Sequence, residues 1–588
     1  MGIKGRKVGS ILAVLLLLVS AGWAQQKAPR KRTAADERAR REAIARRGGA
    51  ARGEEMRRAA KGAERRVMFS RAPGAFGGFA GAPTAMARHT GIFDTDGDAG
   101  IVPTNLIDAR VLATLRERGV EPANLCSDQV FVRRVYLDVI GTLPEPREVR
   151  SFLQDRRPDK RAALIDTLLE RDEFADYWAL KWCDLLRVKA EFPINLWPNA
   201  VQAYHRWIHD ALRENMPYDQ FARELLTSSG SNFRVPPVNF YRAIQGHEPS
   251  AIAEAVALTF MGVRMEDWPE ARRSGMAAFF SRVAYKKTSE WKEEIVYLDP
   301  ASTESLKAVF PDGVAVRIPP DEDPRQVFAD WLVAPDNPWF ARNIVNRIWA
   351  WLLGRGIIHE PDDIRPDNPA VNPGLLACLE KELVNANYDL RHIYRLILNS
   401  RTYQQSPIPR SDHPDAEALF AHYPVRRLDA EVLIDALCWI TGTQESYSSL
   451  IPEPFTFIPE RQRTIALVDG SITSQFLEMF GRPARDTGME SERNNQPTDA
   501  QRLHLLNSTH IQRKIERSGR LQRLVRASKG NRRTLINMIY INILSRYPTQ
   551  AELAAAEKYY QTDGLNLRQA TNDLIWALIN TKEFLYRH

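Results

Sequence analysis

The stretch 336–356 constrains the fold most, because it combines helical apolar spacing with signals for both ends of a helix. It predicts a helix that begins after Asn337, with Pro338 in its first turn, and that ends at Gly354 or Gly356. Five apolar residues share one face at three- and four-residue spacing: Phe340, Ile344, Ile348, Trp351 and Leu352. We therefore expect a chain built around amphipathic helices.

The same helix carries a polar stripe, formed by Arg342, Asn346 and Trp349. Such a stripe can be a solvated face, a buried hydrogen-bonded network or a binding surface. The spacing alone leaves these three interpretations open.

Helical patterns recur along most of the chain, and β-type patterns are few. Helices are expected over 105–119, 127–140, 160–170, 174–188, 199–215, 251–261, 324–333, 373–385, 390–400, 428–442, 500–507, 532–544, 549–560 and 566–581. Strands are expected at 294–298 and 314–318, and a short one within 240–244. The sequence thus predicts a mainly α fold with a first helical domain at 101–322, a small β element near the end of that domain, and a second helical domain at 323–588.

The N-terminus has the three parts of a secretory signal peptide at 1–24. Lys4, Arg6 and Lys7 precede an apolar run over 8–19, and small residues around Ala24 favour cleavage before Gln25. The apolar run is shorter than the ~20 residues that span a bilayer. The chain is therefore expected to be periplasmic or secreted, without a transmembrane segment after cleavage.

The net charge of +8 is concentrated at the N-terminus. Residues 1–66 carry a net +12, so the rest of the chain carries about −4. A general nucleic-acid groove on the folded body is not predicted. The segment 25–100 is a basic, low-complexity arm and linker that either contacts an anionic envelope polymer or another secreted protein, or serves only as a spacer.

Known catalytic motifs are missing from the sequence. It contains no nucleophile elbow, Walker loop, dinucleotide fingerprint or complete metal cluster. His205 and His209 have metal-ligand spacing, but no third ligand accompanies them. No catalytic residue, metal site or cofactor is assigned.

Arginine, asparagine and carboxylate residues recur together in helical contexts, and a guanidinium group can bind a carboxylate or sulfate with two hydrogen bonds. If these residues converge on a cleft, they predict a site for an anionic or sugar ligand, with paired carboxylates as acid and base. If they pair with one another, they are buried ion pairs that join helix ends; Arg134 and Asp138 are expected to form one such local pair. The candidate ligand-binding residues are Arg342, Asn346, Arg347, Asp362, Asp363, Arg482, Arg485, Glu492 and Arg493.

Short motifs are spread along residues 105–588. They include Arg-Arg-x-Tyr-Leu-Asp at 133–138, Trp-x-Asp-Leu-Leu-Arg at 182–187, Asp-Asn-Pro-x-Phe-Ala-Arg at 336–342, Val-Asn-Arg-x-Trp at 345–349, Pro-Asp-Asp at 361–363, Phe-Gly-Arg-Pro-x-Arg at 480–485 and Glu-Arg at 492–493. Through these motifs the chain resembles a family of large exported bacterial proteins, typical of planctomycetes and their relatives, that pair two domains of unknown function. The family is often associated with cytochrome c modules.

The chain departs from that family at its haem motif. Family members commonly carry Cys-x-x-Cys-His just after the segment that corresponds to 260–263, whereas residues 264–268 here read Arg-Met-Glu-Asp-Trp. Cysteines common before the Glu-Arg motif are also replaced, by Met489 and Ser491. Haem-linked electron transfer is therefore disfavoured.

Two functions remain in view for this exported chain. One is a non-catalytic scaffold or binding protein of the cell envelope. The alternative is an extracytoplasmic hydrolase or lyase that acts on an anionic polysaccharide. Convergence of the candidate residues in one open pocket favours the enzyme, and mutual pairing favours the scaffold.

Overall fold

A computed structural model of the chain describes residues 92–95, 101–301, 303–458 and 460–588. All described residues belong to one compact unit. The predicted signal peptide and most of the predicted arm therefore lie outside the described residues. The division of the folded body near residue 322 stays a prediction.

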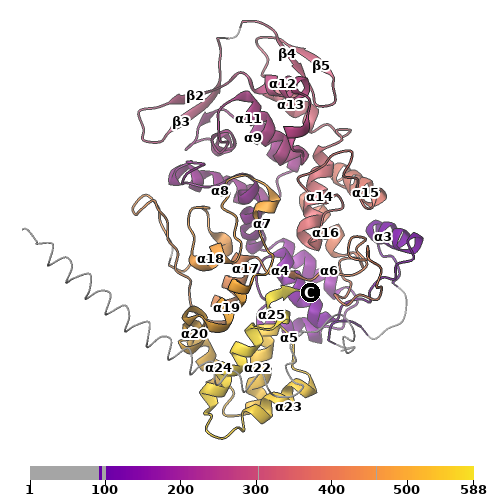
Figure 1. The fold of residues 1–588 in the computed structure, drawn as a ribbon, viewed down its shortest axis with the longest axis vertical. Helices are drawn as coiled ribbons and strands as arrows, with labels where there is room; N and C mark the ends of the chain where they lie inside the picture. Colours follow the sequence, from indigo (N-terminus) through magenta and orange to yellow (C-terminus); the bar gives the residue numbers. More distant parts are fainter. Residues whose placement is uncertain (1–91, 96–100, 302, 459) are drawn as a thin grey trace, which may run out of the picture. The chain divides into compact units, whose positions relative to one another are not determined.

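The predicted mainly α class is confirmed, since about 51% of the structure is helical and the described sheets have only two or three strands (Figure 1). The helices up to residue 277 are α3 (Leu106–Glu117), α4 (Asp128–Val139), α5 (Pro146–Gln154), α6 (Lys160–Leu169), α7 (Asp172–Leu185), α8 (Pro198–Arg213), α9 (Tyr218–Thr227), α10 (Asn239–Arg242), α11 (Pro249–Val256) and α12 (Glu270–Ala277). Those after residue 323 are α13 (Pro324–Leu332), α14 (Phe340–Leu353), α15 (Pro373–Asn385), α16 (Leu390–Leu398), α17 (Ala430–Thr441), α18 (Gln475–Met479), α19 (Asp499–Asn507), α20 (Thr509–Glu516), α21 (Gly519–Ala527), α22 (Arg532–Leu544), α23 (Gln550–Tyr559), α24 (Leu567–Ile579) and α25 (Lys582–Leu585).

The strands form three small antiparallel sheets. They are β1 (Gly230–Ser231), β2 (Val283–Lys287), β3 (Glu294–Leu298), β4 (Leu306–Val309), β5 (Ala315–Ile318), β6 (Arg426–Arg427) and β7 (Tyr586–Arg587). The first sheet has the order β1-β3-β2, with Val283 opposite Leu298. β4 and β5 form a hairpin, and β6 pairs with β7, so that the last residues of the chain are joined to the segment before α17.

The short strand expected within 240–244 is wrong, because this segment is helical as α10. A 3-10 turn at Pro236–Val238 leads directly into α10. The Asn239 amide closes the turn by donating to the backbone oxygens of Asn232 and Pro236, at 2.8 and 3.0 Å. The hydrogen bonds of the Asn239 side chain thus favour a helical turn here, although the aromatic residues Phe240 and Tyr241 are typical of strands.

Helix α14 confirms the expected stop and revises the expected start. It ends at Gly354, whose φ of +75° is a left-handed conformation that favours glycine. It begins at Phe340, and Pro338 lies before it, because the Asn337 side chain accepts hydrogen bonds from the backbone N–H groups of Trp339 and Phe340. The polar stripe is not a solvated face, since Asn346 and Trp349 are fully buried.

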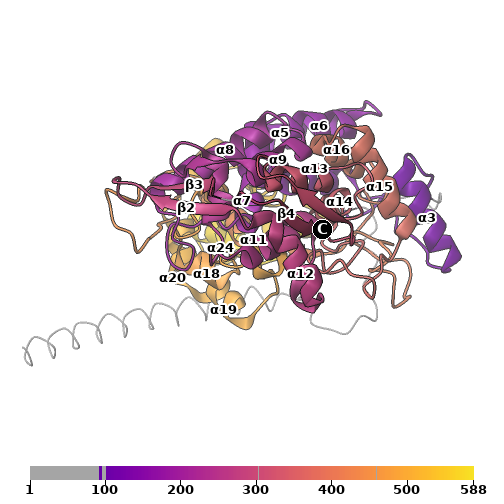
Figure 2. The ribbon, with the colours of Figure 1, turned by 90° about the horizontal axis from the view of Figure 1, so that it is seen from above.

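One hydrophobic core joins the two halves of the chain. The Trp178 ring of α7 lies 4.5 Å from the Tyr394 ring of α16 and 5.4 Å from the Trp351 ring of α14, measured between centroids. Helix α6 lies beside α16, and α3 lies beside α15, in both views (Figure 1 and Figure 2). Residues far apart in the sequence therefore build a shared interior.

Helix α4 fastens the C-terminal segment through buried arginines. Arg133 donates to the backbone oxygens of Ile543 and Phe584, at 2.8 and 3.0 Å. Arg134 donates to the backbone oxygens of Tyr403 and His588, at 2.7 and 2.8 Å. Unpaired carbonyls at chain ends and turns are strong acceptors, which explains the use of guanidinium groups here.

The local ion pair expected between Arg134 and Asp138 is wrong. Arg134 is committed to backbone carbonyls, and Asp138 instead pairs with Arg426 at 3.1 Å and Arg587 at 3.4 Å. The i, i+4 spacing permitted a surface pair, but both side chains are buried, so tertiary partners take precedence over the local one.

Candidate functional site

Two predicted site residues of α14, Asn346 and Arg347, are buried and bind other parts of the fold. Asn346 donates to the backbone oxygen of Ile358 and accepts from its N–H, each at 2.9 Å. This pair of bonds fixes the loop that leaves Gly356, where an added Cβ would lie 2.2 Å from the Ile358 oxygen. Asn346 therefore serves as a brace for this loop.

Arg347 joins α14 to the segment 258–259 and to the loop that carries Asp362. It donates to the backbone oxygens of Thr259 and Leu258, at 2.6 and 2.7 Å, and forms an ion pair with Asp362 at 2.6 Å. The second carboxylate oxygen of Asp362 accepts from the backbone N–H of Glu490 at 2.5 Å. Arg347 and Asp362 are thus both paired within the protein, and about 0% and 1% of their side chains are exposed.

Arg482, Arg485 and Arg493 form a second buried cluster. Arg485 and Arg493 bind the two carboxylate oxygens of Asp184 at 2.9 and 2.6 Å. Arg493 also binds Glu431 at 2.7 Å, and Arg482 lies 3.5 Å from the same carboxylate. The sequence predicted the arginines, but their acidic partners come from α7 and α17.

The cluster continues into a chain of ion pairs through the interior. Arg493 lies 3.9 Å from Asp429, which also pairs with Lys181 and Arg587, each at 3.1 Å. Arg587 in turn reaches Asp138 at 3.4 Å. Helices α4, α7 and α17 and the C-terminal strand β7 are thereby linked by one buried charged network.

The electrostatics of this network keep Asp184 and Asp429 ionised. Burial acts to raise the pKa of Asp184, but Arg493 and Arg485 outweigh it and lower that pKa below its usual value. Burial opposes ionisation of Asp429 in the same way, and Lys181, Arg587 and Arg493 hold its pKa well below the usual range. For Arg482, burial lowers the pKa to about 10, so the guanidinium stays charged near neutral pH.

Asp363 and Glu492, the remaining acidic candidates, make local contacts. Asp363 pairs with Arg365 at 3.2 Å. Glu492 accepts from the backbone N–H groups of Asp486 and Thr487, at 3.0 and 3.3 Å, and so caps a tight loop. Neither forms an ion pair with another predicted site residue among the described contacts.

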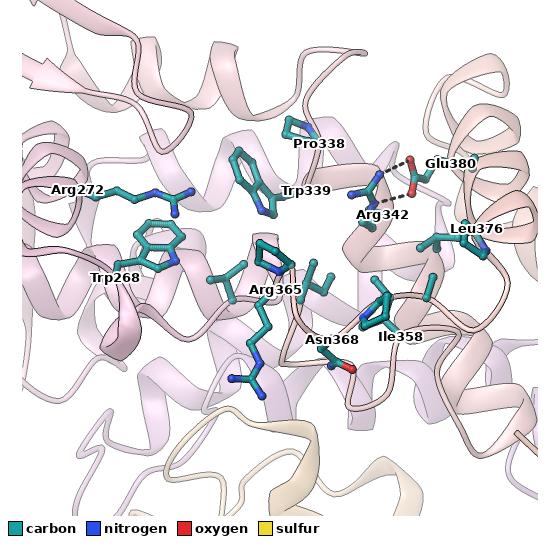
Figure 3. Close-up of a pocket in the computed structure, with 17 residues that line it drawn as sticks. Trp268, Arg272, Pro338, Trp339, Arg342, Ile358, Arg365, Asn368, Leu376 and Glu380 are labelled. Carbon is teal, nitrogen blue, oxygen red and sulfur yellow. Dashed lines mark hydrogen bonds and ion pairs between the residues drawn. The ribbon is translucent and has the colours of Figure 1, made fainter.

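Arg342 is a predicted site residue that lines an open pocket, to which the other eight predicted site residues do not contribute. The pocket has a volume of about 420 Å³, and Figure 3 shows the side chains that line it. Its wall is mostly apolar: Val263, Trp268, Pro338, Trp339, Ile358, Ile364, Pro366, Pro369, Ala370, Pro373, Leu376 and Ala377. Its charged and amide groups are Arg272, Arg342, Arg365, Glu380 and Asn368.

The arginines of the pocket differ in how far they are engaged. Arg342 binds Glu380 through Nε at 2.8 Å and Nη2 at 3.4 Å. The Arg272 guanidinium stacks 3.8 Å from the centre of the Trp268 ring and donates through Nε to the Pro311 oxygen at 2.8 Å. In the described part of the chain, Nη1 of Arg342 and both Nη groups of Arg272 have no hydrogen-bond partner. These groups remain available to a ligand.

Trp268 and Arg272 were missed by the sequence analysis. Residues 264–268 were considered only as the place where a haem motif is lacking. The local signal was the four-residue spacing between an indole and a guanidinium, which suits a cation–π contact. The nearness of this pair to α14 could not be predicted, because it depends on the tertiary fold.

Among the described residues there is no candidate metal site and no candidate membrane span. The described residues contain no group of three or more histidine, cysteine, aspartate or glutamate side chains arranged to hold a metal ion. Among the same residues, no helix has both the length and the apolar character that crossing a membrane requires.

Two family matches cover most of the folded body. Residues 106–272 match PSCyt2, a protein of unknown function (DUF1549), and residues 324–560 match PSD1, a protein of unknown function (DUF1553). No curated protein and no solved structure shows a significant match to the chain. The chain belongs to the planctomycete-type family in which these two domains of unknown function are paired.

Proposed function

We propose that the protein is a non-catalytic binding protein of the cell envelope and that its ligand occupies the pocket of Trp268, Arg272, Trp339 and Arg342. The observation that supports this most is the origin of the lining residues. Val263, Trp268 and Arg272 come from the region that matches the first family domain, and the others come from the region that matches the second. Ligand sites form preferentially at such junctions.

The proposed ligand carries a carboxylate or sulfate group. The available Nη groups of Arg272 and Arg342 face this pocket from two sides (Figure 3). A guanidinium group gives an anion two parallel charge-assisted hydrogen bonds, which a neutral ligand cannot match. Glu380 holds Arg342 in place through the opposite edge of its guanidinium and leaves Nη1 to the ligand.

The ligand also needs an apolar face. The indoles of Trp268 and Trp339, together with Pro338, Pro366, Pro369 and Pro373, contribute to the apolar wall. Aromatic rings stack on the C–H faces of sugar rings and on planar rings, while a polar rim fixes orientation. An acidic saccharide has both properties, and it is the ligand class that we propose.

Export and attachment complete the proposal. The signal peptide at 1–24 would place the protein in the periplasm or outside the cell. The basic arm at 25–100 would add a contact to an anionic envelope polymer or to another secreted protein. The scaffold role follows from a binding body that is tethered by a charged arm.

The hydrolase or lyase alternative has less support. Hydrolysis of a glycosidic bond by acid and base catalysis generally uses two carboxyl groups that flank that bond. Asp362 and Glu492 are instead occupied by protein contacts, and Glu380 is the only acidic residue among those that line the pocket. A binding role therefore accounts for the geometry better.

Titration calorimetry with trigalacturonate and a sulfated disaccharide tests the proposal. At least one of them should bind, whereas neutral galactotriose should not. Arg272→Gln and Arg342→Gln should each weaken binding about tenfold, or ~1.4 kcal/mol, because each removes a charge-assisted hydrogen bond.

Arg147→Gln provides the matched control, because Arg147 is 79% exposed and pairs only with the nearby Glu145 in the described contacts. This variant should bind like the unchanged protein. Equal affinity in all four proteins, or release of shortened sugars during the titration, would contradict the proposal.

A further inference from the structure

A second small pocket lies at the N-terminal end of α8, apart from the residues of the pocket already described. It has a volume of about 250 Å³, and its lining includes Asn199, Gln202, Phe455, Thr456 and Asp469. This volume is below the ~300–1,000 Å³ of pockets for drug-sized ligands, so it suits a single small ring. Amide, hydroxyl and carboxyl groups in one small cavity match the hydrogen-bonding pattern of a sugar.

The hydroxyl group of Thr456 points to a missing partner. Thr456 is 3% exposed, and its Oγ1 has no hydrogen-bond partner in the described residues. A buried hydroxyl without a partner destabilises the folded state, so native proteins seldom leave one in this state without a reason. A ligand hydroxyl in the pocket would satisfy it.

Exposed aromatic side chains continue from this pocket across the surface. Phe457, which also lines the pocket, is 70% exposed, and Trp291 at the turn between β2 and β3 is 70% exposed. The Trp197 ring lies between Phe455 and Trp291. The distance between ring centres is 5.5 Å to Phe455 and 6.4 Å to Trp291.

The backbone holds Trp197 in an unfavourable conformation. Its φ of +71° and ψ of 147° are in a region that is nearly restricted to glycine. The conformation positions the indole between the hairpin and the 455–457 loop. Strain of this kind is concentrated at functional sites, where it serves to present a side chain.

The charge around this surface argues for a neutral ligand. Asp469 is the only charged residue among those that line the pocket, and it is 2% exposed. Burial raises its pKa, although backbone N–H groups of Ser471 and Ala190 act against this. The β2–β3 hairpin that carries Trp291 holds three lysines (Lys286, Lys287 and Lys292) and three glutamates (Glu290, Glu293 and Glu294), and the Lys292 ammonium lies 5.5 Å from the centre of the Trp291 ring. This balance of charge offers a polyanion no advantage.

We propose that the pocket beside Thr456, the exposed aromatics Phe457 and Trp291, and the half-buried Trp197 form a binding surface for a chain of neutral pyranose sugars. One ring occupies the pocket, where Thr456, Gln202 and Asn199 bind its hydroxyl groups. The following rings stack on the aromatic side chains. This site is independent of the arginine pocket and of its proposed ligand.

The test is a titration of the purified protein with cellohexaose, xylohexaose and chitohexaose. At least one should bind with a Kd of about 1 mM or tighter. Trp291→Ala and Phe457→Ala should each weaken binding about fivefold or more, because each removes a stacking surface. Tyr547→Ala, at an aromatic residue that is 42% exposed, is the matched control and should leave binding unchanged.

Thr456→Val separates a ligand contact from a structural role. It should weaken binding about threefold, and it should leave the melting temperature equal or higher, because it removes a buried hydroxyl that has no partner. The proposal is overturned if none of the three sugars binds, or if the aromatic variants bind as well as the unchanged protein. It is also overturned if the aromatic variants change only the oligomeric state, since the surface would then be an interface between copies. Loss of acidic-sugar binding in the Arg272 and Arg342 variants would leave this result unaffected.

Discussion

The buried arginines act mainly as structural partners at the scale of single residues. Arg493 is 6% exposed and binds two carboxylates, Asp184 and Glu431, that come from different helices. Taking such groups out of water is costly, and the cost is offset only when each charge has close partners. Arg493 therefore stabilises the fold by neutralising the buried carboxylates of Asp184 and Glu431.

Replacing Arg493 by Met should lower the free energy of unfolding by about 3–5 kcal/mol, since two buried carboxylates would lose their common partner. Urea denaturation followed by circular dichroism measures the change. Arg395→Met is the control, because Arg395 pairs with Asp166 at the surface and should contribute about 1 kcal/mol or less. A loss below about 1 kcal/mol in the Arg493 variant would contradict the structural role.

Helix ends show at the scale of elements how local sequence fixes local structure. Gly354 ends α14 with φ +75°, and an added Cβ would also lie 2.9 Å from the Arg426 guanidinium. Gly374 lies in the first turn of α15 with an ordinary backbone, and an added Cβ there would find no contact closer than 3.7 Å. The two glycines are therefore in opposite situations.

Gly354→Ala should destabilise the protein by about 1–2 kcal/mol, because alanine is strained in the left-handed conformation. Gly374→Ala should stabilise it by up to about 1 kcal/mol, because alanine favours helix. Thermal unfolding of both variants measures this difference. Equal shifts of the same sign in both variants would contradict the assignment of α14's end.

Elements with strong local signals could be predicted from the sequence, and those without such signals could not. The bounds 373–385 and 532–544 agree with α15 and α22, where a clear cap precedes an apolar pattern. The helices α9, α20 and α21 were missed, because their apolar faces are short and their polar residues resemble loops. Segment 240–244 was given the wrong type, because two buried aromatics in a row suit a strand as well as a short helix.

At the scale of the whole molecule, the candidate site was only partly predictable. Arg342 was identified from its helical stripe, whereas Trp268 and Arg272 were not, because no periodicity reveals that 263–272 lies against 338–380. For the same reason, the pairing of Asp184 and Glu431 with Arg485 and Arg493 could not be predicted. Residue types were predictable, but their partners depended on tertiary packing.

The buried ion-pair network and the arginine pocket both use arginine side chains, but in different ways. In the interior, arginines and carboxylates satisfy one another and join the two family domains into one body. At the pocket, the two domains meet with arginine donors left over and with indoles that face the opening. The buried network thus holds the molecule together, and we propose that the pocket binds the ligand.

Hydrogen exchange with and without trigalacturonate tests this claim most directly, because it reads both regions in one experiment. The account predicts slower exchange in peptides that cover 263–272 and 338–380, with no change in those that cover 482–493. Protection of 482–493 without protection around the pocket would contradict it and would make the arginine cluster the binding site.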